Sequence, residues 1–533
     1  MDLASSIDLS KKRTDRNSRE RRMIRSDSFT RRALLRGTGI AAIASAMPYR
    51  LLAQTPNRGG DLAIAINGAS SGDTLDPRSF NSPFMAVVGG TVFNTLVETA
   101  GADGATRPGL ALSWSETESG KVWRFDLSQD AVFHDGRKLT SADVIYSLML
   151  HVAEGSRSNS RPIINSIETI AADGDNAVVI TLKGPNYFFP AALSNYSLAI
   201  VPDGTTTFDG IGTGPYRVTR FAPGEVLETE RFDGYFRKDR AFVDKVSLLG
   251  VNDAAARVSA IQSGQVQISS TLDARSVALL QSLPNLKISY MTGAGFAGFN
   301  MMVDKPPFDN VKLRQALKLA VDREDMIQRI FAGQARLGND TPIPPNSTDF
   351  AASVEQTVYD PDRARALYAE SGHSGPLVLQ TSDAVGSEAV DMATLFAEHA
   401  AKAGITIEVK REPADGYWSN VWAKAPFHAT LWGARPTSDL IMTLAYTTGS
   451  PANDTAFADP EFDAALATAR GSSSEEERKA AMAEAQRFLH ERGGVIIPAF
   501  ANLAEGLAAN LNGYEAGTLL VGSTRAAENV WFG

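Results

Sequence analysis

The sequence predicts a mixed α/β fold divided into two or three domains, from its length, its short strand-like runs and its helical stripes. The chain has 533 residues, more than a single hydrophobic core usually supports. Residues 61–66, 123–127 and 177–182 carry the alternation or the β-branched residues typical of strands. No internal repeat or low-complexity linker separates the parts, which favours domains joined by short crossovers.

Helical periodicity is clear in the second half of the chain. Apolar residues recur at i, i+3, i+4 and i+7 from Leu313 to Ala320, after a predicted helix cap at Asp309. Ser474 and Glu477 have the spacing of a capping box ahead of a second apolar stripe. We expect both stripes to be core packing and assign them no function.

The N-terminal segment has the features of an export signal. Residues 11–36 are crowded with Lys and Arg, and residues 37–46 are small or apolar. Residues 28–36 resemble a twin-arginine (Tat) signal, which implies the Tat export machinery as a partner. Cleavage is expected after Ala46 or Ala53. A disordered basic tail that binds nucleic acid is the alternative, and the order of the features favours export.

The net charge and the lack of cysteine limit the cellular locations that are expected for the mature protein. Residues 1–54 hold 12 basic and 5 acidic residues, and the remainder holds 40 basic and 56 acidic residues, a net charge of −16. An acidic mature protein is poorly suited to nucleic acid or to anionic membranes. The chain contains no cysteine, which excludes disulfides, a thiol nucleophile and a lipid-anchoring cysteine. We therefore expect a periplasmic protein that carries no lipid anchor.

Catalytic and metal-binding patterns are weak. Residues 68–72 fit G-x-S-x-G, but the turn-forming residues 73–77 follow in place of the required helix. Residues 293–298 fit G-x-G-x-x-G, again without the helix that would hold a pyrophosphate. The six histidines never adopt a metal-ligand spacing. We expect no enzymatic activity, no metal and no cofactor.

Several blocks along the chain resemble one family. They are residues 107–114, 123–127, 132–137, 139–144, the G-T-G-P-Y block at 212–216, residues 260–266 and residues 308–323. In this order they resemble the family 5 extracellular solute-binding proteins, which bind oligopeptides, dipeptides and nickel. Locally, Gly136 is predicted to form a turn, and Gly212 and Gly214 a tight bend, so these blocks are expected to determine the fold.

The resemblance implies a two-lobed periplasmic-binding-protein (Venus-flytrap) fold with an additional domain, as in the dipeptide- and oligopeptide-binding proteins. Lobe I would comprise residues 55–90, 206–295 and 495–533, with the extra domain at 91–205 and lobe II at 296–494. A small peptide or related solute would be enclosed between the lobes. The monomeric protein would then deliver it to the permease and ATPase subunits of an ABC importer.

The candidate site lies in residues 427–439. In peptide binders of this family, a Trp-containing block carries an aspartate that pairs with the peptide's amine, and by spacing Arg435 occupies that position here. A guanidinium suits a carboxylate instead, unless it forms a structural salt bridge. Asp439 is a candidate for the missing anion. The candidate aromatic walls are Trp432, Trp418 and Tyr417, with Trp418 and Trp432 favoured over Trp422.

Three functions remain open. Uptake of a peptide or peptide-like carboxylate is favoured. A non-peptide solute, such as an opine-like compound, a glycoside or a nickel chelate, is the alternative that Arg435 supports; bare nickel lacks clustered ligands. A ligand sensor or chaperone that acts with a separate partner is the third.

Overall fold

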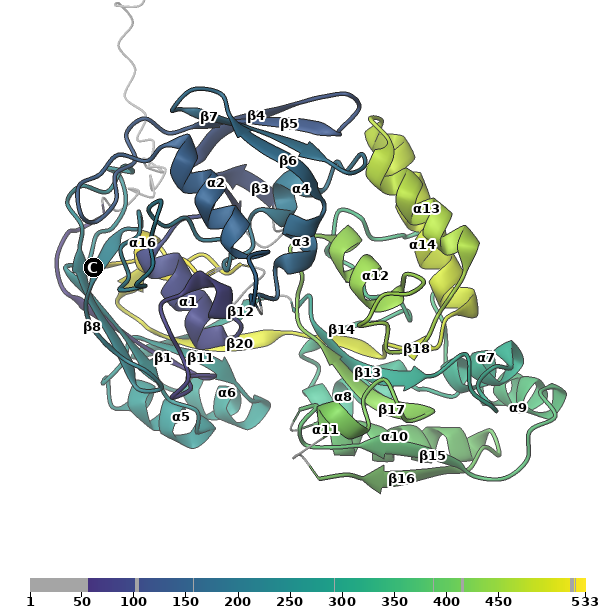
Figure 1. Ribbon diagram of the computed structural model, residues 1–533. Helices are drawn as coiled ribbons and strands as arrows, with labels where there is room; N and C mark the ends of the chain where they lie inside the picture. The colour runs from purple at the N-terminus through teal and green to yellow at the C-terminus, as the bar shows by residue number, and fades with distance from the viewer. Residues whose placement is uncertain are drawn as a thin grey trace, which may run out of the picture. The chain divides into compact units, whose positions relative to one another are not determined.

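The computed structural model describes residues 56–533 except 101–104, 157, 292, 387, 414–416, 518–521 and 523. The expected signal segment and both cleavage sites lie outside the described residues. Residues 55–533 form one compact unit, which contains three principal sheets flanked by helices (Figure 1). Within the described part, no helix combines the length and apolar character needed to cross a bilayer.

A seven-stranded sheet has β1 at its centre, hydrogen-bonded in parallel to β10 and β11. Alternate residues of β1 face opposite cores: Leu62 and Ile64 pack toward α1, and Ala65 packs toward α5 and α6. The sheet order is β12-β20-β11-β1-β10-β9-β8, with β1 (Asp61–Ile66), β8 (Tyr216–Ala222), β9 (Val226–Arg231), β10 (Lys245–Gly250), β11 (Ile268–Leu272), β12 (Leu286–Met291), β20 (Leu503–Ala508), α1 (Pro83–Val92), α5 (Ala254–Gln262) and α6 (Ala274–Leu280).

A four-stranded antiparallel sheet, in the order β4-β5-β7-β6, forms the second layer system. One of its faces is buried around Phe125, Val178 and Ile180, all with 0% of their surface exposed. Its elements are β4 (Ala111–Thr117), β5 (Val122–Leu127), β6 (Ile167–Ala172), β7 (Ala177–Leu182), α2 (Ser141–Leu150), α3 (Arg161–Asn165) and α4 (Phe189–Ala192), beside the hairpin of β2 (Val97–Ala100) and β3 (Ala105–Pro108).

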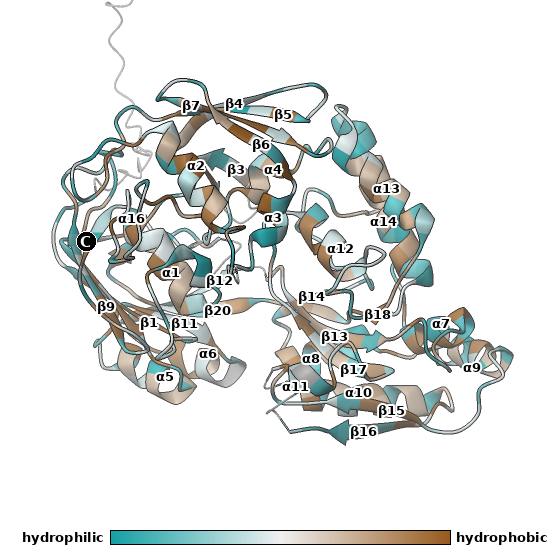
Figure 2. Cartoon of the chain, in the orientation of Figure 1, coloured by the Kyte–Doolittle hydropathy of each residue, from teal (hydrophilic) through white to brown (hydrophobic). Residues whose placement is uncertain are grey.

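A five-stranded sheet, in the order β16-β15-β17-β13-β18, organises the third part. Its edge strand β16 is largely hydrophilic (Figure 2), as an exposed edge requires. The elements are β13 (Phe296–Met301), β15 (Leu377–Thr381), β16 (Ile407–Arg411), β17 (Phe427–Trp432), β18 (Val495–Ile496), α7 (Val311–Leu319), α8 (Arg323–Phe331), α9 (Pro361–Glu370), α10 (Ala389–Lys402), α11 (Tyr417–Asn420), α12 (Ser438–Tyr446), α13 (Pro460–Gly471) and α14 (Glu475–Arg492).

The smaller elements complete the described chain. They are η1 (Pro77–Ser79), α16 (Ala526–Asn529), the pair β21 (Leu511–Asn512) and β22 (Trp531–Phe532), and the pair β14 (Ala335–Leu337) and β19 (Ala499–Ala501). The strands expected at 61–66 and 177–182 are confirmed, and residues 123–127 lie in β5.

One predicted helix cap is wrong, and the other is confirmed in part. Asn310, and not Asp309, caps α7, because its Oδ1 accepts the Lys312 N–H at 2.9 Å. Ser474 caps α14 by accepting the Glu477 N–H at 3.2 Å. The Ser474 N–H donates to Ser472 Oγ at 3.1 Å and not to the Glu477 carboxylate, so the capping box is not completed.

The chain crosses twice between the seven- and five-stranded sheets, at neighbouring places. β12 leads to β13 through residues 292–295, and β19 leads back to β20. A Cβ on Gly293 would collide with the carbonyl oxygen of Ala501, so the two crossings touch where only glycine fits. Because β18 pairs with β13, the second crossing falls a few residues after the expected residue 495. The other expected domain boundaries stay a prediction.

The family-like blocks meet in the interior of the fold. The His134 ring nitrogens lie 3.3 Å from the Gly210 carbonyl oxygen and 3.0 Å from that of Gly214. Gly136 has a φ of +89°, in the predicted turn. A Cβ on Gly214 would collide with the backbone of Val92. These blocks therefore join the four-stranded and seven-stranded parts.

Candidate ligand-binding site

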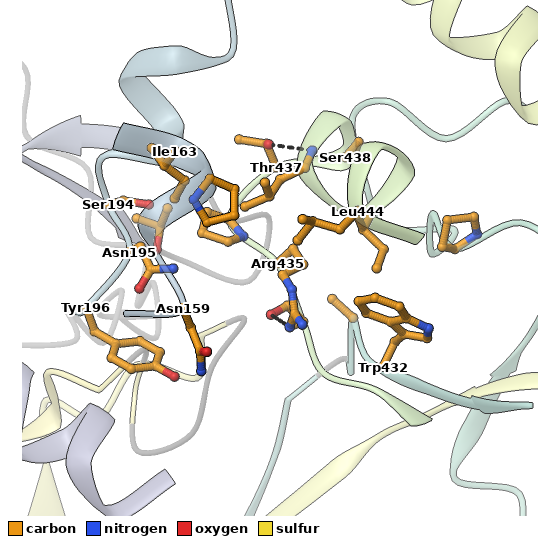
Figure 3. A pocket seen from close by; sticks show the side chains of 18 of the residues that line it. Asn159, Ile163, Ser194, Asn195, Tyr196, Trp432, Arg435, Thr437, Ser438 and Leu444 are labelled. Atoms are coloured by element: carbon orange, nitrogen blue, oxygen red, sulfur yellow. Dashed lines mark hydrogen bonds between the residues drawn. The ribbon is translucent and has the colours of Figure 1, made fainter. Parts of the chain in front are cut away.

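A cavity of about 460 Å³, here called the main cavity, is lined from all three sheet systems (Figure 3). Its volume is within the usual range for small-molecule sites. Lining residues on the side of the first two sheets include Phe80, Thr99, Asn159, Asn195 and Tyr196. Those on the five-stranded side include Pro344, Asn346, Trp432, Arg435 and Leu444.

Arg435 lies in the loop between β17 and α12 and points into the main cavity (Figure 3). Its Nη1 donates to the carbonyl oxygens of Gly433 at 3.0 Å and Ala434 at 3.3 Å. The guanidinium carbon lies 5.3 Å from the centroid of the Trp432 ring. Arg435 forms no salt bridge with any described residue. Burial lowers the pKa of this guanidinium, an effect that the Tyr196 phenol partly opposes.

The remaining lining is uncharged. Of the described residues around the main cavity, Arg435 alone carries a full charge at neutral pH. Hydroxyl and amide side chains supply the other polar groups, among them Asn81, Asn159 and Asn195. The site therefore offers one cation and several neutral hydrogen-bonding groups. Such a set suits a ligand that bears a carboxylate or another oxyanion.

Trp432 is the last residue of β17 and is held rigidly as a cavity wall. Its Nε1 donates to Asp454 Oδ2 at 2.9 Å, and only 5% of the residue is exposed. The same oxygen accepts from Thr430 Oγ1 at 2.7 Å and from Trp422 Nε1 at 3.1 Å. Burial raises the pKa of the Asp454 carboxyl to about 6, and these donors only partly oppose the shift.

Two of the other predicted site residues are buried away from the main cavity. Tyr417 is 1% exposed, and its hydroxyl donates to the Ala429 carbonyl oxygen at 2.8 Å. Asp439 is 6% exposed and accepts from Arg470 Nε at 2.5 Å. Neither residue lines the main cavity. Their contacts are those of residues that stabilise the five-stranded part.

Trp418, on α11, is 41% exposed and packs edge-on against Trp422, with ring centroids 6.0 Å apart. It does not line the main cavity either. Of the five predicted site residues, only Arg435 and Trp432 line the main cavity. Asn159, Asn195 and Tyr196 were missed, since they lie in irregular segments where no periodic pattern marks a functional side chain.

The four-stranded part and the five-stranded part also touch each other directly, through Tyr187, Phe188 and Leu440. The Tyr187 N–H donates to the Arg470 carbonyl oxygen at 2.9 Å, and the Arg478 guanidinium carbon lies 5.0 Å from the Tyr187 ring centroid. Phe188 packs against the core around α13 and α14, and Leu440 packs against the core of the four-stranded sheet. We call this set the bridging contact.

Two histidines of the five-stranded part, His428 and His399, have contacts within the protein. No cluster of three or more His, Asp or Glu side chains suited to a metal ion occurs among the described residues. His428 Nδ1 lies 2.8 Å from the Ala425 carbonyl oxygen, and the His399 ring contacts Asp325 at 2.9 Å. Both histidines thus have partners within the protein.

Comparison with known proteins gives the family. The model of the bacterial extracellular solute-binding proteins, family 5 (middle), matches residues 105–456, more than half of the chain. A curated relative, named probable di/tripeptide-binding protein 5, from Pseudomonas aeruginosa, is 27% identical over 501 residues, covering 85% of this chain and 92% of the relative.

Solved structures share the fold. The periplasmic binding protein DppA from Helicobacter pylori, in complex with the peptide STSA, has a TM-score of 0.75 at 22% identity and covers 89% of this chain and 98% of its own. AgaA from A. tumefaciens R10, in complex with agropinic acid, has a TM-score of 0.74 at 23% identity, with coverages of 89% and 99%. The predicted two-lobed periplasmic-binding-protein fold is confirmed, and this chain belongs to the family 5 bacterial extracellular solute-binding proteins.

Proposed function

We propose that this protein is the periplasmic substrate-binding component of an ABC importer, and that it binds a peptide or peptide-like ligand through a carboxylate. One observation carries the ligand class: Arg435 points into a cavity with no acidic residue among its described lining residues. A guanidinium can hold a carboxylate through two parallel hydrogen bonds. The Trp432 ring beside it provides an apolar surface for the rest of the ligand.

Enclosure of the ligand follows from the way the cavity is built. Its walls belong to different sheets, and the chain crosses between those sheets at the touching residues Gly293 and Ala501. Neighbouring crossings form a hinge about which the two sides can separate. A ligand that contacts both sides favours the closed state, and the permease recognises that state.

The cellular setting rests on the sequence of the first 53 residues. The basic segment followed by small and apolar residues supports export, with the twin-arginine pattern as the route. These features support a mature protein that acts in the periplasm with membrane permease and ATPase subunits.

A non-peptide solute is the second candidate. In peptide recognition a carboxylate would hold the free amine, and the described lining of the main cavity contains none. Asp439, the candidate named from the sequence, is paired with Arg470. An opine-like acid, in which the amine is substituted, would suit this set of groups, and the structural relative AgaA is known in complex with agropinic acid.

The deciding experiment is a thermal-shift screen against di- to pentapeptides, opines, glycosides and nickel chelates, followed by calorimetry on each hit. A native-state ligand at about 100 times its Kd adds about 2.7 kcal/mol to the stability. Arg435→Ala is expected to weaken a carboxylate ligand about 10- to 100-fold, because charge-assisted hydrogen bonds are lost. Arg336→Ala, at an exposed arginine outside the main cavity, is the control.

The outcomes separate the two candidates. Peptide binding that Arg435→Ala weakens, and Arg336→Ala does not, supports carboxylate capture of a peptide. Shifts with opines alone favour the second candidate. Ligands that bind equally well to the Arg435→Ala and Arg336→Ala variants would refute the role proposed for Arg435.

A further inference from the structure

A second cavity, of about 140 Å³, lies between β3, residues 237–240 and the C-terminal segment. We call it the arginine cavity. Thr99 lines both this cavity and the main cavity. A small space of about 20 Å³ shares Tyr196 with the main cavity and Arg525 with the arginine cavity. The arginine cavity therefore borders the main cavity at Thr99.

Four charged residues form the inner wall of the arginine cavity and neutralise one another. Arg237 Nη1 lies 2.9 Å from Glu98 and 2.8 Å from Glu528. Arg525 lies 2.9 Å from Glu98 and 3.3 Å from Glu528. The two carboxylate side chains are only 5% and 4% exposed. Burial alone would raise the pKa of Glu528, but Arg237 and Arg525 hold it below its usual range.

Two further arginines line the arginine cavity without such partners. Arg107, on β3, and Arg240 are both half-buried. Neither forms an ion pair or a side-chain hydrogen bond with any described residue, in contrast to Arg237 and Arg525. Glu515 also lines the cavity, but it is exposed to water. The inner wall is neutral overall, so Arg107 and Arg240, set against Glu515, leave the described lining residues with a net charge of +1.

The geometry points to a second oxyanion-binding site, held by Arg107 and Arg240 in the arginine cavity. Its volume admits a carboxylate or a phosphate group, and two guanidiniums provide the donors that such groups accept. The acidic end of a ligand in the main cavity could supply the oxyanion, in which case the ligand carries two anionic groups. A free anion such as phosphate is the other source of the same chemistry. The first source rests on the proposed function; the site itself does not.

The test uses the full-length chain with Arg435→Ala as the background, so that the main cavity contributes no cation. Inorganic phosphate is titrated at constant ionic strength and the stabilisation is followed by thermal shift. We expect the double variant Arg107→Gln/Arg240→Gln to raise the apparent Kd for phosphate at least tenfold. Arg336→Gln removes the same type of charge from an exposed position and is expected to leave the Kd unchanged.

A second arm identifies the source of the oxyanion. The peptides Glu-Ala-Ala and Gln-Ala-Ala differ by one carboxylate and are compared in the chain with Arg435 intact. Tighter binding of Glu-Ala-Ala that the double variant abolishes assigns the site to the cleft ligand. Phosphate binding without this peptide difference assigns it to a free anion.

The proposal is overturned if phosphate gives no stabilisation and the two peptides bind equally well, or if the double variant leaves both the phosphate Kd and the peptide difference unchanged. Loss of folding is not expected to obscure the result, because Arg107 and Arg240 have no bonds to described residues that a substitution would break. Failure of the proposed function would show separately, as ligands that bind independently of Arg435.

Discussion

Asp454 and Glu528 are both buried carboxyl groups, yet their pKa values move in opposite directions. Asp454 lies behind the wall of the main cavity and accepts hydrogen bonds from neutral indole and hydroxyl donors. Glu528 lies in the wall of the arginine cavity and contacts two guanidiniums. Burial raises the pKa of Asp454 to about 6, whereas the cations hold that of Glu528 low.

The difference shows that burial alone does not fix the charge of a carboxyl group. Neutral donors orient Asp454 and, through it, Trp432, but they only partly offset the desolvation of the charge. Two nearby cations offset it fully for Glu528. One region therefore gains rigidity for a cavity wall, and the other gains a fixed, neutral ion cluster.

The largest expected effect is in the ion cluster. Arg237→Met should lower the free energy of unfolding by about 3 kcal/mol or more, because it leaves two buried carboxylates with Arg525 as their remaining cation. Urea denaturation followed by circular dichroism measures it. Arg217→Gln breaks the exposed pair with Glu230 and should cost less than about 1 kcal/mol. Equal losses of unfolding free energy in the two variants would mean that the buried ion cluster stabilises the fold no more than an exposed ion pair does.

The next effect is a pH dependence of opposite sign in the two regions. Asp454 has a raised folded-state pKa, so between about pH 4 and pH 6 the folded state holds a proton that the unfolded chain has released. Its contribution to stability falls by at most about 3 kcal/mol as pH rises through that window. Asp454→Asn should therefore gain stability relative to the natural chain between pH 4 and pH 7.

Glu528 supplies the matching control. Its folded-state pKa is lowered, so its stabilisation is present above the unfolded-state pKa and is lost as the pH falls below it. The loss of stability caused by Glu528→Gln should therefore be smaller in acid than at neutral pH. Urea denaturation of Asp454→Asn at pH 4 and pH 7, and of Glu528→Gln at pH 7 and at about pH 2.5, measures the two slopes. If the stability difference between variant and natural chain changed with pH in the same direction for both variants, the opposite pKa shifts given to Asp454 and Glu528 would be wrong.

The smallest effect is expected from one donor to Asp454. Trp422→Phe removes the indole N–H that lies 3.1 Å from Asp454 Oδ2 and should cost about 1–2 kcal/mol. The pKa of Asp454 should rise further, because one hydrogen bond to its charged form is lost. A carboxyl titration followed by NMR would detect the change; an unchanged pKa would mean that this donor contributes nothing to the charge of Asp454.

Local patterns predicted the regular elements well, because strands and amphipathic helices follow from the spacing of apolar residues. β1 and β7 occupy the expected residues. The glycines at 293–298, which mimic a nucleotide-binding motif, are explained by tertiary structure. Gly293 lies against Ala501, and a Cβ on Gly295 would meet the Trp432 carbonyl oxygen at 2.7 Å. Sequence alone could not reveal these neighbours.

The site was only partly predictable. Arg435 and Trp432 were predicted because they stand in a recognisable block that ends one strand of the sheet, and both line the main cavity. Tyr417 and Asp439 share that neighbourhood in sequence but are buried against partners contributed by distant residues, such as Arg470. Tyr196 reaches the same cavity from another part of the chain. Sequence spacing reports neither kind of long-range contact.

The bridging contact has a consequence for how long a ligand stays. It consists of one backbone hydrogen bond, one cation–π contact at Tyr187 and the packing of Phe188 and Leu440. Together these are of the order of a few kcal/mol, against the 5–15 kcal/mol that keeps a domain folded. Substitutions at Tyr187 should therefore shorten the residence time of a bound solute while leaving the fold intact. The stability of the fold and the residence time of the ligand therefore depend on different residues.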